Sequence, residues 1–123
     1  MKAGIRFHIR DGSHGTEMAI GPGKVALLEA IARTGSITSA AKGLGMSYRR
    51  AWLLVDETNR CLVRPAVATA AGGQRGGGTA LTPFGVELVR RYRALERQTE
   101  VAVARKLKPM LRVLPKGADN SDR

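Results

Sequence analysis

The chain is poor in the residue types that build covalent, metal and catalytic sites. It has one cysteine, Cys61, in 123 residues, so it forms no internal disulfide, as is typical of a protein of the reducing cytoplasm. His8, His14 and Cys61 are too scattered to follow a metal-binding motif. The sequence also lacks a nucleophile with a positioned general base. We therefore expect no catalytic residues, no metal, no cofactor and no enzymatic activity.

Long apolar runs and aromatic residues are scarce as well. No apolar run approaches the roughly 20 residues of a transmembrane helix, and the N-terminus lacks the apolar region of a signal peptide. Aromatic residues make up 4% of the chain, so its core must consist mainly of Leu, Val, Ile and Ala. Membrane binding is the weaker hypothesis, because no amphipathic segment has a strong apolar face with Trp or Phe anchors.

Positive charge, in contrast, is abundant. The chain has 21 Lys and Arg against 10 Asp and Glu, a formal net charge of +11. Residues 90–116 hold nine basic residues and only two acidic ones, Glu96 and Glu100. A basic chain of this kind binds nucleic acid, anionic lipid or an acidic protein. The basic run either flanks DNA or keeps a helix soluble.

The N-terminal 20 residues have the alternating pattern of a β-hairpin. Ile5, Phe7 and Ile9 alternate with polar residues, which predicts a half-buried strand. A turn cluster follows at residues 11–15, and residues 16–20 are expected to return as a second strand.

Residues 24–59 show three helical patterns separated by glycine-containing turns. The first helix is expected over residues 24–34 and ends at Gly35, a helix C-cap. Ser36 and Ser47 are expected to cap the second and third helices, with Gly45 and Met46 in the turn between them. Trp52, in the third helix, is interpreted as a core residue. The expected buried positions are Val25, Leu27, Leu28, Ile31, Ala32, Ile37, Ala40, Ala41, Leu44, Ala51, Leu54, Val55 and Thr58.

A glycine-rich hairpin and a long helix follow. Residues 62–69 are expected to form a strand despite Pro65, and residues 79–81 the return strand, with a glycine-rich tip between them. Thr82 and Pro83 begin a long helix, which should stop before Pro109. Its apolar seam is the expected dimer interface, formed by Leu88, Tyr92, Leu95 and Thr99.

This order of elements is that of a winged helix-turn-helix. The fold class is mostly α with small β hairpins and a long C-terminal dimerisation helix. The expected boundaries are residues 1–20 for an N-terminal β-hairpin, 21–81 for the winged helix-turn-helix with its wing at 70–79, 82–114 for the dimerisation helix and 115–123 for a disordered tail.

In a helix-turn-helix the second helix of the motif enters the DNA major groove. Arg49 and Arg50 fall in the first turn of that helix, and arginine can grip guanine O6 and N7 together. Ser47 and Tyr48 could add phosphate contacts, and Ser36 is either a cap or a DNA contact. The alternative to base contacts is that Arg49 and Arg50 only form part of a solvent-exposed face of the helix. At the wing tip, Arg75 would reach a phosphate or the minor groove. The alternative is a flexible loop that makes no DNA contact.

Several segments together resemble the N-terminal DNA-binding domain of the ModE family of molybdate-responsive regulators. They are Gly35-Ser36-Ile37, Ala40-Ala41-Lys42, the run from Ser47 to Trp52, and the glycine-rich run from Gly72 to Gly78. The helix-turn-helix alone also resembles LysR-type regulators. The resemblance covers about residues 25–95.

The resemblance implies a winged-helix dimer that binds double-stranded DNA, with dimer contacts around residues 82–108 and 5–20. Members of the family continue into molybdate-binding domains, whereas this chain ends at residue 123. The chain is therefore expected not to bind molybdate tightly, and a molybdate response would need a separate molybdate-sensing protein. Its expected function is cytoplasmic, sequence-specific regulation of transcription, with a link to molybdate metabolism.

Two other functions remain open at the level of sequence. A winged helix can serve as a protein-interaction module, with the charge serving solubility. A basic chain can also bind RNA, although this one lacks interleaved aromatic residues for base stacking. Binding to a palindromic duplex in preference to random DNA would distinguish the regulator from both alternatives.

Overall fold

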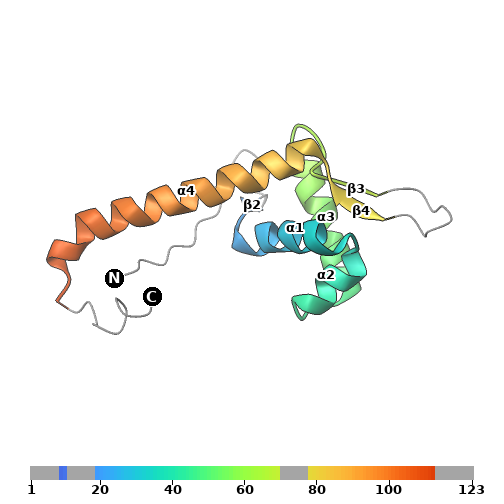
Figure 1. The fold of residues 1–123 in the computed structure, drawn as a ribbon, viewed down its shortest axis with the longest axis horizontal. Coiled ribbons are helices and arrows are strands. Elements are labelled where there is room, and N and C mark those ends of the chain that lie inside the picture. The colour runs from blue at the N-terminus through green and yellow to red at the C-terminus, as the bar shows by residue number, and fades with distance from the viewer. Residues whose placement is uncertain (1–8, 11–18, 70–77, 113–123) are drawn as a thin grey trace. The chain divides into compact units, whose positions relative to one another are not determined.

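Helices dominate the residues that the computed structural model describes, which are 9–10, 19–69 and 78–112 (Figure 1). The helices are α1 (Pro22–Thr34), α2 (Ile37–Gly43), α3 (Tyr48–Cys61) and α4 (Pro83–Leu107), followed by a short 3-10 turn at Lys108–Met110. The strands form two antiparallel pairs, β1 (Ile9–Arg10) with β2 (Ala19–Ile20) and β3 (Val67–Thr69) with β4 (Thr79–Leu81). The expected fold class, a mostly α winged helix-turn-helix with small hairpins and a long C-terminal helix, is confirmed.

The chain divides into two compact units, Phe7–Arg90 and a second unit of Met1–Arg6 with Arg91–Arg123. The first unit contains both strand pairs, the helix-turn-helix and the first turns of α4. The second contains the rest of α4 and the 3-10 turn. The tip of the expected wing and the expected disordered tail lie outside the described residues.

Local capping signals determine where the helices of the first unit begin and end. Pro22 opens α1, and Gly35 ends it in the left-handed conformation at φ 72°, donating its N–H to the carbonyl of Ile31. Ser36 and Ser47 cap α2 and α3 through their side-chain oxygens, which accept hydrogen bonds from the N–H groups of Ser39 and Arg50 at 3.0 and 3.1 Å. The capping roles predicted for Gly35, Ser36 and Ser47 are confirmed.

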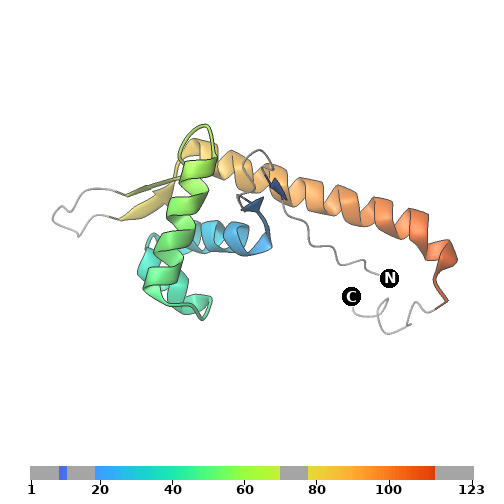
Figure 2. The same ribbon diagram turned by 180° about the vertical axis from the view of Figure 1, so that it is seen from behind.

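The core of the first unit lies where α1, α2 and α3 meet beside β4 (Figures 1 and 2). Two predicted core residues are exposed, Ala32 and Leu44. Ala32 lies at the edge of the buried arc, because α1 is covered by α2, α3 and β4 and its buried face is centred nearer Leu27 and Ile31. Leu44 is the C-cap of α2 and has left the helical path, and Met46 packs against the core instead.

The base of the β3–β4 hairpin is held by the side chain of Asn59, near the end of α3. The Asn59 Oδ1 accepts hydrogen bonds from the N–H groups of Ala66 and Val67 at 2.8 and 3.1 Å, and Nδ2 donates to the Val67 carbonyl at 3.1 Å. The strand predicted over residues 62–69 therefore begins only at Val67. The residues before it form bends and include Pro65, which has no N–H to donate.

The start of α4 is anchored to the same loop. Thr82 donates its backbone N–H to the Ala66 carbonyl at 2.9 Å and its hydroxyl to the Pro65 carbonyl at 2.7 Å. The Thr82 oxygen also accepts from the N–H of Gly85 at 3.0 Å, so it caps the helix as predicted. The helix ends at Leu107, before Pro109, as the sequence predicts.

No helix in the described part of the chain is both long enough and apolar enough to cross a membrane.

Candidate nucleic-acid interface

The first two turns of α3 present an exposed face. Arg49 and Arg50 are both exposed, and the neighbouring Tyr48 and Leu53 are 53% and 41% exposed. The opposite face of the same helix is buried through Ala51, Val55 and Thr58, which fix the orientation of α3 on the core. The two arginines therefore project from a rigid helix rather than from a loop.

Trp52 is exposed, so its interpretation as a core residue is wrong. The side chain is 46% exposed. It follows Tyr48 by four residues, which places both rings on one side of α3. That side of the helix is adjacent to its buried face. The small side chain of Ala51, rather than that of Trp52, packs against the core. The helical periodicity alone does not distinguish these neighbouring positions.

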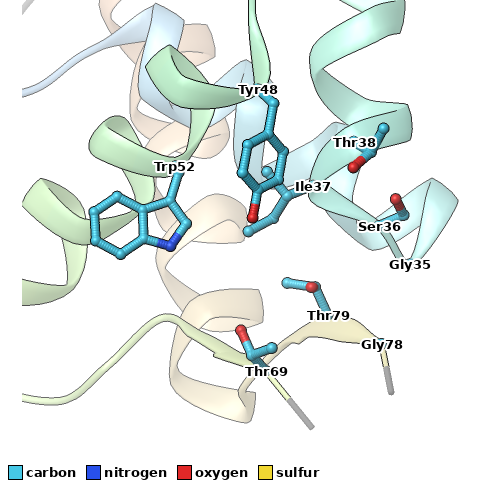
Figure 3. A pocket seen from close by; sticks show the side chains of 9 residues that line it. All are labelled: Gly35, Ser36, Ile37, Thr38, Tyr48, Trp52, Thr69, Gly78 and Thr79. Atoms are coloured by element: carbon cyan, nitrogen blue, oxygen red, sulfur yellow. The ribbon is translucent and has the colours of Figure 1, made fainter. Parts of the chain in front are cut away.

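A hollow of about 360 Å³ lies where three segments that are distant in the sequence meet. Trp52 and Tyr48 contribute their rings from α3, Thr69 and Thr79 line it from the hairpin, and the start of α2 forms the remaining wall (Figure 3). The lining residues are Gly35, Ser36, Ile37, Thr38, Tyr48, Trp52, Thr69, Gly78 and Thr79.

Beside the hollow, a backbone hydrogen bond joins the hairpin to the turn after α1. The N–H of Thr79 donates to the carbonyl of Gly35 at 3.0 Å. A side chain at Gly78 would come within 3.7 Å of the same carbonyl, an ordinary contact distance. The hairpin base is thus attached to the helix-turn-helix at this point as well as through Asn59.

The hollow is lined by neutral groups. Hydroxyls come from Ser36, Thr38, Thr69, Thr79 and Tyr48, and the indole N–H comes from Trp52, while none of the described residues that line it is charged. Such groups can donate hydrogen bonds to phosphate oxygens, and the aromatic rings offer apolar faces. Of the residues that line the hollow, the sequence predicted Ser36 and Tyr48 as candidate DNA contacts, whereas Trp52 and the three threonines were not among its candidates.

The predicted DNA contacts are therefore only partly brought together. Ser36, Ser47, Tyr48, Arg49 and Arg50 lie on or beside the start of α2 and α3. Arg75 lies outside the described residues.

The predicted dimer residues on α4 differ in accessibility. Leu88 packs against the core of its own unit, and Tyr92 is only 3% exposed. Leu95 is 44% exposed, and the Thr99 hydroxyl donates to the Leu95 carbonyl at 2.7 Å. Among the four predicted seam residues, Leu95 is therefore the large apolar side chain that is accessible to a second copy of the chain.

The cysteine is positioned as part of the packing of α3. The Cys61 Sγ donates to the Thr58 carbonyl at 3.3 Å. Burial raises the pKa of the Cys61 thiol, and nearby Lys24 opposes the shift. The thiol is therefore protonated at neutral pH, which makes it a poor nucleophile. Within the described residues, no group of three or more His, Cys, Asp or Glu is arranged to hold a metal ion.

Comparisons with known proteins found no matching family model. The chain is 48% identical over 81 residues to the molybdenum-pterin-binding protein MopB of Rhodobacter capsulatus, covering 66% of this chain and 30% of that protein. It is 45% identical over 87 residues to the molybdenum transport protein ModE of Azotobacter vinelandii, covering 71% and 32%. It is 41% identical over 71 residues to the DNA-binding transcriptional dual regulator ModE of Escherichia coli, covering 58% and 27%.

Among solved structures, ArgP from Mycobacterium tuberculosis aligns with a TM-score of 0.48 and 21% identity, covering 72% of this chain and 30% of that one. The chain thus spans about a third of the length of the curated relatives it matches. None of the three relatives compared above is named as an enzyme. The matched segment of the chain belongs to the ModE family and corresponds to the N-terminal part of those longer proteins.

Proposed function

We propose that this chain is a sequence-specific regulator of transcription that binds double-stranded DNA as a homodimer in the cytoplasm. The observation that carries the proposal is the exposed first turn of α3, which holds Arg49 and Arg50, in a chain of net charge +11. The Escherichia coli relative is named as a DNA-binding regulator, which favours DNA over RNA or a protein as the partner.

We propose different roles for the basic residues. Arg49 and Arg50, which are exposed at the start of α3, would meet base edges in the major groove. The wing would lie along the backbone, where Arg75 would contact a phosphate or enter the minor groove. Phosphate contacts set general affinity, whereas bidentate contacts to bases set sequence preference.

We expect DNA binding to weaken steeply with salt, with each neutralised phosphate contributing about −0.9 to the slope of log K against log salt concentration. Arg49→Ala and Arg50→Ala should each lose about 1–3 kcal/mol on the preferred duplex and relax one position of the site. Arg75→Ala should weaken all duplexes alike. The measurement is anisotropy of labelled duplexes, using a sequence selected from random DNA and a scrambled version of it.

Arg60→Ala is the matched control, because Arg60 lies in the last turn of the same helix and loses the same charge. It should leave the ratio between selected and scrambled duplexes unchanged. A flat salt dependence would contradict DNA binding. Equal losses on both duplexes for Arg49→Ala and Arg50→Ala would contradict the recognition role.

The homodimer is proposed to form through the seam of α4. Two recognition helices related by a dimer axis would lie about 34 Å apart, one turn of DNA. Because Leu88 packs against its own core, a charge there would unfold the first unit, whereas Leu95 can be changed without that effect. Leu95→Glu should therefore convert a dimer to a monomer at micromolar concentration, as measured by sedimentation.

Val101→Glu is the control for this experiment. Val101 is 55% exposed on the same helix but lies outside the seam, so the dimer should persist. A monomeric wild-type chain at micromolar concentration, or a Leu95→Glu variant that stays dimeric, would contradict the proposed interface.

We further propose that the regulated genes serve molybdenum metabolism. The Azotobacter vinelandii relative is named a molybdenum transport protein and the Rhodobacter capsulatus relative a molybdenum-pterin-binding protein. The matched part spans about a third of each relative.

A further inference from the structure

We infer that the hollow between α3 and the base of the β3–β4 hairpin receives the sugar-phosphate backbone of one DNA strand, with Trp52 and Tyr48 packing against the deoxyribose. The inference rests on the proposed function, because it requires that the chain bind DNA. It gives a role to two aromatic side chains that the fold leaves uncovered.

The rings of Tyr48 and Trp52 stand clear of the face that α3 packs on the core. The helix buries one face on the core through Ala51 and Val55. The rings stand on the adjacent side, where Tyr48 is 53% exposed and Trp52 is 46% exposed. Exposed large apolar groups that lie together mark a binding surface more often than isolated ones do. Aromatic side chains with a polar atom suit surfaces that are wet on one side and covered on the other.

The size and chemistry of the hollow fit one sugar-phosphate unit. Its volume of about 360 Å³ is at the lower end of the range for small-ligand sites. Hydroxyls of Thr38, Thr69 and Thr79 stand around the aromatic rings (Figure 3). Protein–DNA contacts to phosphate commonly use hydroxyl donors of this kind. The rings supply apolar faces for the sugar, which carries no charge.

The charge of the neighbouring helix turn and the position of the hollow favour DNA as the occupant. The described residues that line the hollow are neutral, but Arg49 and Arg50 follow Tyr48 directly on α3. With α3 in the major groove, a strand at the edge of that groove would run between α3 and the hairpin, and the hollow lies between these two elements. An acidic protein would also satisfy the charge, so a duplex and its binding signal must be tested directly.

Trp52 is the only tryptophan in the chain, so fluorescence excited at a wavelength that tyrosine does not absorb reports on the hollow alone. On saturation with the selected duplex, the acrylamide quenching constant of Trp52 should fall about twofold, because a side chain that is 46% exposed becomes covered. Anisotropy of a labelled duplex, measured in parallel, reports binding independently of the tryptophan.

Variants test the energetic contribution. Trp52→Ala should lower affinity for the duplex about tenfold, Trp52→Phe should retain most of it, and Tyr48→Phe should lose only the contact of the hydroxyl. Val63→Ala is the control, because Val63 is 88% exposed, follows the end of α3 and does not line the hollow. Far-ultraviolet circular dichroism should show that all four variants are folded.

The outcomes separate the two levels of the proposal. Duplex binding with unchanged quenching of Trp52, or with wild-type affinity in folded Trp52→Ala, overturns the inference and leaves the proposed function standing. A duplex that does not bind at all overturns the proposed function and this inference with it.

Discussion

Replacing Gly85 by alanine should lower the free energy of unfolding by about 2–3 kcal/mol. A Cβ at this position would lie 2.2 Å from the carbonyl oxygen of Ala66 and 2.9 Å from its carbonyl carbon. These are backbone atoms and cannot turn aside as a flexible side chain would. The same carbonyl accepts a hydrogen bond from the N–H of Thr82. To make room for the Cβ, the start of α4 would have to move away from the loop before β3, which would disturb this hydrogen bond.

Urea unfolding followed by circular dichroism measures this effect. Gly23→Ala is the control, because nothing lies within 4 Å of the Cβ that it would add in the first turn of α1. That substitution should be neutral or stabilise the chain by up to about 1 kcal/mol, since alanine is the better helix former. Equal stability of the two alanine variants would show that the close approach at Gly85 is not a structural constraint.

The sequence predicted the features that depend on neighbouring residues. Ser36 and Ser47 cap their helices because a short hydroxyl side chain reaches an N–H only three residues ahead. Gly35 ends α1 because glycine adopts the left-handed conformation without a Cβ clash. Thr82 caps α4, and Pro109 follows the end of that helix. Each of these signals is local, so no knowledge of the packing was needed.

The features that the sequence did not predict depend on what covers each helix. Trp52 and Ala51 are adjacent in the sequence, and only the packing of α3 on the core decides that the alanine is buried and the tryptophan exposed. The beginning of β3 depends on Asn59, which occupies the N–H groups of Ala66 and Val67. The hollow joins segments from residue 35 to residue 79, a juxtaposition that no local pattern encodes.

Removal of the Asn59 side chain should destabilise the chain and weaken DNA binding together. Asn59→Ala deletes three hydrogen bonds to Ala66 and Val67, which are 0% and 4% exposed. The two N–H groups would then be buried without this partner, at about 1–3 kcal/mol each before relaxation. We expect the free energy of unfolding to fall by about 2–4 kcal/mol. Since Asn59 joins α3 to the hairpin, affinity for the selected duplex should fall as well.

Arg60→Ala is the matched control on the adjacent residue. The Arg60 guanidinium pairs with Asp56 at 3.0 Å, but the Arg60 side chain is 70% exposed, and an exposed pair of this kind contributes no more than about 0.5 kcal/mol. Urea unfolding should therefore separate the two variants clearly. A loss below about 1 kcal/mol in Asn59→Ala would mean that water replaces the amide at the hairpin base. The hairpin would then be held on the helix-turn-helix by its own packing and by the hydrogen bond from Thr79 to Gly35 after α1, rather than through Asn59.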